Sequence, residues 1–151
     1  MFACGVEGSE ALIDLAKPLE KRLPQFLPLP DRGVDFIAYS WSDDGRWLAG
    51  VRQRRGGAHD PGILIYSLAD KRYVRLTSSG DGPLWLHDSR RLLYYEGESV
   101  LLLDARTGES RPVLAPPEGS TYSDLSLSSD DRVLYLARTI DEGHIWLLKL
   151  E

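Results

Sequence analysis

Two pairs of adjacent aspartates come nearest, in residue type and spacing, to catalytic chemistry in this chain. Asp43-Asp44 lies in "SWSDDGRWLAG" and Asp130-Asp131 in "LSLSSDDRVLYL". Two close carboxylates can divide acid and base roles or bind a cation. The alternating acids of a calcium loop are absent, however. Both pairs stand where a chain of strands must turn, and aspartate suits turns because its side chain accepts nearby backbone N–H groups. We therefore interpret them as turn residues.

The three histidines do not form a metal-binding pattern. His59, His87 and His144 lie on separate segments and have no partner at a short, regular spacing. His87 occupies a turn position equivalent to Asp43, which favours a surface role. The sequence also lacks the Gly-x-Ser-x-Gly nucleophile motif and a phosphate-binding glycine-rich loop. We predict no catalytic residues, no metal site and no cofactor.

A cluster of arginines supplies the candidate binding residues. The segment "RQRRGGAHDPG" (52–62) concentrates Arg52, Arg54 and Arg55, followed by His59. Arginine side chains suit carboxylates or phosphates, and loops on a rigid scaffold are where binding residues collect. The alternative is a solvated hairpin tip with no ligand. Both interpretations stay open at this stage.

An internal repeat organises the chain. Aligning Arg46, Arg90 and Arg132 places them 44 and 42 residues apart, each after an acidic turn. Trp41 and Trp85 fall at one repeat position, which favours packing between repeats over a ligand platform. A second block recurs as "ILIYSLADKRYVRLT", "VLLLDARTGESRPVL" and "HIWLLKLE". A period slightly above 40 with two paired blocks is typical of β-propeller blades.

Each complete repeat divides into four short strands. In the first copy we expect strands at about 35–41, 47–52, 62–68 and 73–77, because apolar runs there are separated by Gly, Asp and Ser clusters. Asp44-Gly45 is a strong hairpin signal, since such turns need a positive φ. The later copies place Ser89 and Asp131 at the glycine position, where they tolerate that geometry less well.

The N-terminal region carries a weaker signal. Residues 9–23 have near-helical apolar spacing, but Pro18 would interrupt a helix. The same residues align with the later strands, with Leu23 opposite Leu76, and we favour that interpretation. The predicted organisation is an irregular segment at 1–10, a partial blade (third and fourth strands) with a linker at 11–34, and blades at 35–78, 79–116 and 117–151. The last blade lacks its final strand.

The fold class that follows is all-β: a β-propeller segment of about three four-stranded antiparallel blades plus a partial blade, forming an incomplete ring. Propellers typically close with four to eight blades. Either the rest of a longer propeller or a second copy of the chain would complete the ring. An open arc is disfavoured because its end blades would leave apolar faces and strand edges in water.

Composition narrows the classes of partner. Eighteen basic and 23 acidic residues leave a formal charge of −5, which gives no general affinity for nucleic acid. No apolar run approaches the roughly 20 residues of a membrane span. The single cysteine, Cys4, cannot form an internal disulfide. It lies in "FACGVEG", which lacks the preceding basic and apolar regions of a signal peptide.

The residues of the repeat also carry a family resemblance. "YSWSDDGRWLAG" followed by "ILIYSLADKRYVRLT" resembles the repeat of TolB-like propellers, and the third copy resembles the closing repeat of bacterial proteins that carry such a propeller, often beside a Ser/Thr kinase domain. Asp43 and Ser129 depart from the usual proline of that pattern. The resemblance implies a WD-repeat-like scaffold that mediates protein contacts, and it points towards a periplasmic or other extracytoplasmic location.

We therefore expect a non-catalytic propeller scaffold for protein–protein interaction, part of a larger bacterial signalling or envelope protein. One alternative is the propeller portion of a prolyl-oligopeptidase-like peptidase, although the chain ends without room for a hydrolase domain. Another is a propeller that binds a small polar ligand or ion. The expected partners are a protein and either the rest of the propeller or a second copy.

Overall fold

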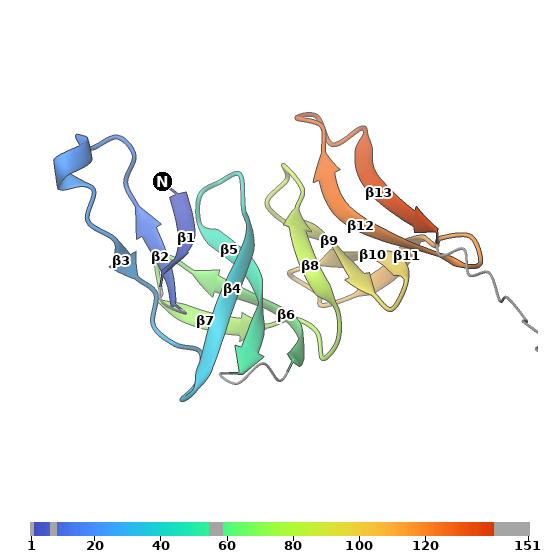
Figure 1. Cartoon of the computed structure of the whole chain (residues 1–151), viewed down its shortest axis with the longest axis horizontal. Helices are drawn as coiled ribbons and strands as arrows, with labels where there is room; N and C mark the ends of the chain where they lie inside the picture. Colours follow the sequence, from blue (N-terminus) through green and yellow to red (C-terminus); the bar gives the residue numbers. More distant parts are fainter. Residues whose placement is uncertain (1, 7–8, 55–58, 141–151) are drawn as a thin grey trace, which may run out of the picture.

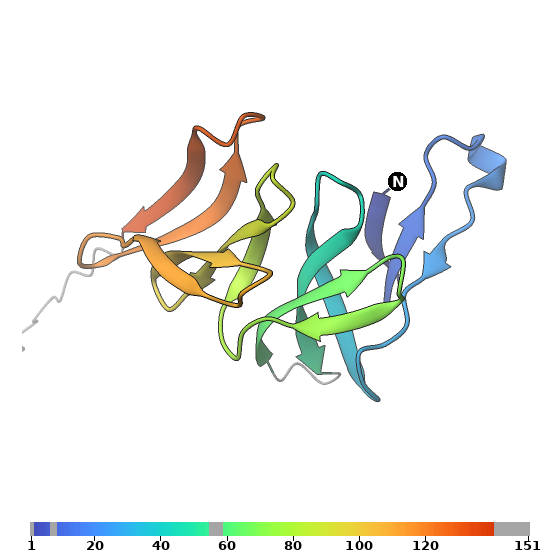
Figure 2. The same ribbon diagram turned by 180° about the vertical axis from the view of Figure 1, so that it is seen from behind.

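The computed structural model describes residues 2–6, 9–54 and 59–140. Four antiparallel sheets follow one another along the chain and lie side by side without closing into a ring (Figures 1 and 2). The described part of the chain contains one short 3-10 helix and no α-helix. The predicted fold class, an all-β partial propeller, is confirmed.

The first complete blade has four strands in sequence order. They are β4 (Val34–Trp41), β5 (Trp47–Arg54), β6 (His59–Ser67) and β7 (Arg72–Arg75). Irregularities in the register lie between Ala38 and Ser40 and between Val51 and Arg52. β6 begins before the expected Gly62, because His59 and the next residue already pair with β5.

The second blade repeats this arrangement. It contains β8 (Asp81–Trp85), β9 (Arg91–Glu96), β10 (Ser99–Asp104) and β11 (Ser110–Leu114). Gly108, at a φ of +74°, lies in the hairpin between β10 and β11, where the sequence places a turn glycine. The first strands of the two complete blades, β4 and β8, contact each other and are the inner strands of their blades.

The third blade is described in part. β12 (Ser120–Leu127) pairs with β13 (Leu134–Ile140). The strand expected at 144–151 lies outside the described residues, as do His144 and Trp146.

The N-terminal sheet corrects the sequence-based expectation. Residues 1–10 were expected to be irregular, yet β1 (Phe2–Val6) pairs along its length with β2 (Ser9–Ile13). The 3-10 helix η1 (Leu19–Lys21) follows Pro18, and β3 is only Gln25–Phe26. Leu23, which the alignment placed in a strand, lies before β3 and is 77% exposed. Apolar spacing missed β1 because its pairing rests on backbone hydrogen bonds, which any residue except proline can donate.

The core lies between the blades. One cluster joins Leu12 and Leu27 of the N-terminal sheet to Leu48 of the first blade. A second joins Ala49 to Leu92 of the second blade. The third joins residues of the second blade to partly buried residues of β12 and β13. The first and second blades are therefore each held by both of their neighbours, which is how stacked repeats bury a continuous core.

Candidate functional site

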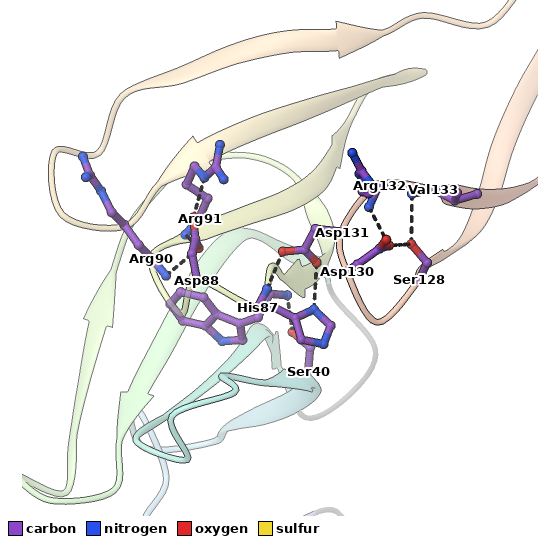
Figure 3. A network of polar contacts seen from close by, with 11 residues as sticks. Ser40, His87, Asp88, Arg90, Arg91, Ser128, Asp130, Asp131, Arg132 and Val133 are labelled. Carbon is purple, nitrogen blue, oxygen red and sulfur yellow. Dashed lines mark hydrogen bonds and ion pairs between the residues drawn. The ribbon is translucent and has the colours of Figure 1, made fainter.

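The turns between the first two strands of each blade share one hydrogen-bonding pattern. The Asp44 carboxylate accepts the backbone N–H of Arg46, at 3.0 Å from Oδ1. Asp88 accepts the N–H of Arg90 at 2.9 Å, and Asp130 accepts the N–H of Arg132 at 3.2 Å (Figure 3). The repeat-related aspartates are therefore turn residues, as the sequence predicted. The neighbouring serine hydroxyl leads the hydrogen bonds that lower the pKa of the Asp44 and Asp130 carboxyls. At Asp88 burial opposes the shift, but the backbone N–H groups of Arg91 and Arg90 still lower the pKa.

The glycine position of these turns has a second role in the later copies. Gly45, Ser89 and Asp131 all adopt a positive φ, of +70°, +53° and +57° respectively. The side chains of Ser89 and Asp131 each reach the turn of the preceding blade. Ser89 Oγ accepts the N–H of Asp44 at 2.9 Å. A side chain at this position therefore adds a link between blades that glycine cannot make, at the cost of a strained backbone.

Asp131 makes the stronger of the two links. Its Oδ2 accepts the backbone N–H of His87 at 2.8 Å, and its Oδ1 lies 2.8 Å from His87 Nδ1 (Figure 3). The hydrogen bond to Asp131 raises the pKa of His87, and the charges of Asp43 and Asp130 act in the same direction. The surface role predicted for His87 is thus a specific one, the contact between two blades.

Ser40 links the inner strands of the first two blades through two hydrogen bonds. Ser40 Oγ on β4 donates to the carbonyl of Pro83 at 2.8 Å and accepts the N–H of Trp85 at 3.1 Å, both on β8. Trp85 is 6% exposed in the core between blades, and Trp41 packs against the neighbouring cluster. Both tryptophans therefore serve packing, as expected from their repeat position.

A groove lies along the inner strands of three blades. It has a volume of about 470 Å³ and is lined by Tyr39 of β4, residues 81–84 of β8, Tyr95 of β9 and residues 122–125 of β12. Burial, and then the charge of the adjacent Asp81 carboxylate, raises the pKa of Tyr39. Two carboxylates and three tyrosines line this groove and no basic residue does. Its chemistry suits a cationic group.

The second carboxylate of the groove belongs to Asp124. This residue has a φ of +55° at an irregularity in β12, and its Oδ2 accepts the hydroxyl of Ser123 at 2.9 Å. The Asp124 side chain is exposed. The Tyr95 hydroxyl, in contrast, is buried beside the Leu125 backbone and makes no hydrogen bond. A strained residue at a groove is a recognised feature of binding sites. The sequence did not predict this groove.

The arginines predicted as binding residues lie among carboxylates. Arg52 is 2.5 Å from Asp31 and 3.3 Å from Asp60, and its side chain is only 18% exposed. Asp60 also lies 3.8 Å from Arg54 and 4.0 Å from Arg75. Arg52 is thus held by charges of its own chain, whereas Arg54, with its side chain 64% exposed, remains accessible.

The other two predicted binding residues are not placed by the structure. Arg55 lies outside the described residues, and only the backbone of His59 is described, as the first residue of β6. The role of this loop in binding stays a prediction.

Two wider properties concern the described residues as a whole. None of their helices is long and apolar enough to cross a membrane. Their histidine, cysteine and acidic side chains form no group of three that could hold a metal ion.

Comparison with known proteins agrees with the repeat analysis. No family model matches the sequence, and no curated protein matches it. Among solved structures, oligogalacturonate lyase from Vibrio parahaemolyticus superposes with a TM-score of 0.57 at 18% identity, over 83% of this chain and 34% of that one. A candidate TolB from Agrobacterium tumefaciens superposes with a TM-score of 0.52 at 13% identity, over 88% of this chain and 62% of that one.

These likenesses define the class of protein. The chain is a β-propeller segment, and its fold is that of TolB-like propeller proteins. It spans about a third of the lyase and about three fifths of the candidate TolB. At such low identity the likeness concerns the fold alone.

Proposed function

We propose that this chain is a non-catalytic propeller scaffold for protein–protein interaction, and that the groove along β4, β8 and β12 receives a segment of the partner. The observation that carries the proposal is the lining of the groove. Tyr39 and Asp81 meet there from neighbouring blades, and Asp124 adds a second carboxylate from the third. A site built by several blades recognises a ligand only when those blades are assembled.

The partner segment should carry a basic side chain. A lysine or arginine entering the groove would pair with Asp81 or Asp124 and lie against tyrosine rings, which attract cations through their faces. Tyr39 is 52% exposed and therefore accessible. The repeat-related aspartates of the turns are already engaged by backbone donors, which supports a structural role for them and a non-catalytic role for the scaffold.

Binding of short labelled peptides tests the proposal. Four fluorescent peptides that share one sequence except for a central Lys, Arg, Glu or Ala would be titrated with the protein, and anisotropy measured. We expect the Lys and Arg peptides to bind at least tenfold more tightly than the Glu and Ala peptides, with affinity that falls as salt is added. Equal affinity for all four would contradict the proposal.

Substitutions locate the binding in the groove. Asp81→Asn and Tyr39→Ala should each weaken binding of the Lys peptide several-fold. Glu20→Gln is the matched control, because Glu20 is an exposed acid on η1, which lies between β2 and β3. If Glu20→Gln weakens binding as much as Asp81→Asn does, the attraction comes from net charge and the groove is not the site.

A further inference from the structure

The groove along the inner strands is built at one repeat position. In β4, β8 and β12 the register of pairing shifts at the same place, which leaves an extra residue in each inner strand. The residues at these shifts line the groove: Tyr39, Gly82, Pro83, Asp124 and Leu125. A β-bulge bends its strand and redirects side chains, and bulges are common beside binding sites. Three aligned irregularities therefore direct residues of three blades into one groove.

Three tyrosine rings stand in the walls of this groove. Tyr95 and Tyr122 are partly buried and pack on the apolar cluster between the second and third blades, so their rings are held in place. The Tyr95 ring also lies against Gly82, where an added Cβ would be only 3.0 Å from it. Tyr39 supplies a third ring from the first blade and is 52% exposed. Tyrosine rings attract cations through their faces.

The two carboxylates of the groove have no basic partner. Within the part of the chain that the structure describes, no lysine, arginine or histidine pairs with Asp81 or Asp124. Their hydrogen bonds come from neutral donors. Asp81 Oδ1 accepts the N–H of Gly82 at 2.6 Å, and Asp124 Oδ2 accepts the hydroxyl of Ser123 at 2.9 Å. Neutral donors occupy acceptor atoms but leave the negative charges uncompensated, so the groove attracts a cation chiefly through charge.

An unmodified lysine matches these walls only in part. Its ammonium group is strongly hydrated and carries three N–H donors, for which the apolar side chains of Pro83, Leu84 and Leu125 have no acceptor. A quaternary ammonium keeps the positive charge but has methyl groups in place of N–H groups. Aromatic rings are the usual means by which proteins recognise such a group. A ligand that also carried phosphate or carboxylate would be repelled, because no basic residue lines the groove.

We propose that the cationic group received by this groove is a quaternary ammonium, presented as a trimethylated lysine on the partner segment. The inference rests on the proposed function, because it names the side chain that the partner inserts. A volume of about 470 Å³ accommodates more than one ammonium group, which favours a side chain on a longer segment over a free small cation. Inner strands line the central channel of a propeller, so blades adjoining this chain would leave the groove open.

Anisotropy titrations with peptides of one sequence test the inference. The central residue is lysine, trimethyllysine or the uncharged analogue of trimethyllysine in which carbon replaces nitrogen. We expect the trimethyllysine peptide to bind about fivefold or more tightly than the lysine peptide, and about tenfold or more tightly than the uncharged one.

The possible failures have different meanings. Equal affinity for the lysine and trimethyllysine peptides would overturn the inference and leave the proposed function standing. Equal affinity for trimethyllysine and its uncharged analogue would also overturn it, because charge would then contribute nothing. If none of the three peptides binds, the proposed function fails and the inference fails with it.

Substitutions of one tyrosine locate the preference in the groove. Tyr39→Leu keeps an apolar side chain but removes the ring, so the affinities for the two cationic peptides should become nearly equal. Tyr39→Phe keeps the ring and should keep the preference for trimethyllysine. Tyr135→Leu is the matched control, because Tyr135 is a 60% exposed tyrosine on β13 that does not line the groove. A Tyr39→Leu protein with an unchanged circular dichroism spectrum and an unchanged preference would overturn the site.

Small competitors distinguish the source of the quaternary ammonium. Choline should displace the trimethyllysine peptide, whereas betaine should not, because its carboxylate would meet Asp81 and Asp124. Choline that binds more tightly than the trimethyllysine peptide would indicate a site for a free small cation and overturn the assignment to a partner segment. Displacement by betaine as strong as that by choline would overturn the role given to the two carboxylates.

Discussion

The His87 imidazole and the Asp131 carboxylate join the turns of two neighbouring blades, with Nδ1 and Oδ1 2.8 Å apart. His87 sits where the first repeat has Asp43, and Asp131 sits where it has Gly45. The two departures from the repeat thus meet each other across a blade junction. In the sequence His87 and Asp131 are two departures from the turn motif, whereas in the structure they form a complementary pair.

Stability should depend on pH through this pair. The hydrogen bond to Asp131 raises the folded-state pKa of His87 above the unfolded value of about 6.5. The stabilisation is therefore complete below about pH 6.5 and is lost as pH rises through the folded-state pKa. Thermal melts from pH 5.5 to 8.5 should show the wild type losing its advantage over Asp131→Asn at the alkaline end. A difference between the two proteins that stays constant with pH would contradict this assignment.

A second ion pair should govern stability in acid. Arg90 lies 2.5 Å from Asp104, and this contact leads the effects that lower the pKa of Asp104 to about 2. Its contribution is present above the unfolded pKa of about 3.9 and is lost as pH falls through 2. Urea unfolding should find Asp104→Asn less stable than wild type at pH 7 and nearly equal near pH 2. Glu118→Gln, at an exposed acid, should show no such pH dependence.

Gly50 should be intolerant of any side chain. A Cβ at this position would clash with the Ile37 carbonyl oxygen and would lie 2.7 Å from the Phe36 ring. Because backbone is in the way, we expect Gly50→Ala to cost about 3 kcal/mol or more in the free energy of unfolding. Gly108→Ala has open space but a φ of +74°, so it should cost only about 1–2 kcal/mol. Denaturant titration measures the free energy of unfolding of both variants. Equal costs would contradict the prediction, because they would show that β4 and β5 separate easily around position 50.

At position 89 we expect glycine to give a more stable protein than alanine, the reverse of the usual order. Both substitutions remove the oxygen that accepts the N–H of Asp44. Only glycine relieves the strain of a φ of +53°, so Ser89→Gly should be more stable than Ser89→Ala by about 1 kcal/mol. Melting temperatures of the two variants test this. If alanine proves the more stable, the turn has moved to an unstrained conformation.

Particular residues show how far the sequence predicts this structure. The spacing of Arg46, Arg90 and Arg132 was sufficient to predict an all-β partial propeller, because strand pairing within a blade depends on local turns and alternating apolar residues. The sequence did not predict β1, because no apolar pattern marks this strand. The groove also escaped notice, since Tyr39, Asp81 and Asp124 are far apart in the chain and meet only where three inner strands lie side by side.

The sequence by itself determined the blades, their turns and the packing role of Trp41 and Trp85, all of which follow from short-range patterns that repeat. Only the tertiary structure decided which polar residues are engaged and which are accessible. It placed Arg52 between Asp31 and Asp60, and it placed Asp81 beside Tyr39 in an open groove. The reason is physical: the charge and burial of a side chain depend on what the neighbouring blade places against it, and neighbouring blades are more than 40 residues apart along the chain.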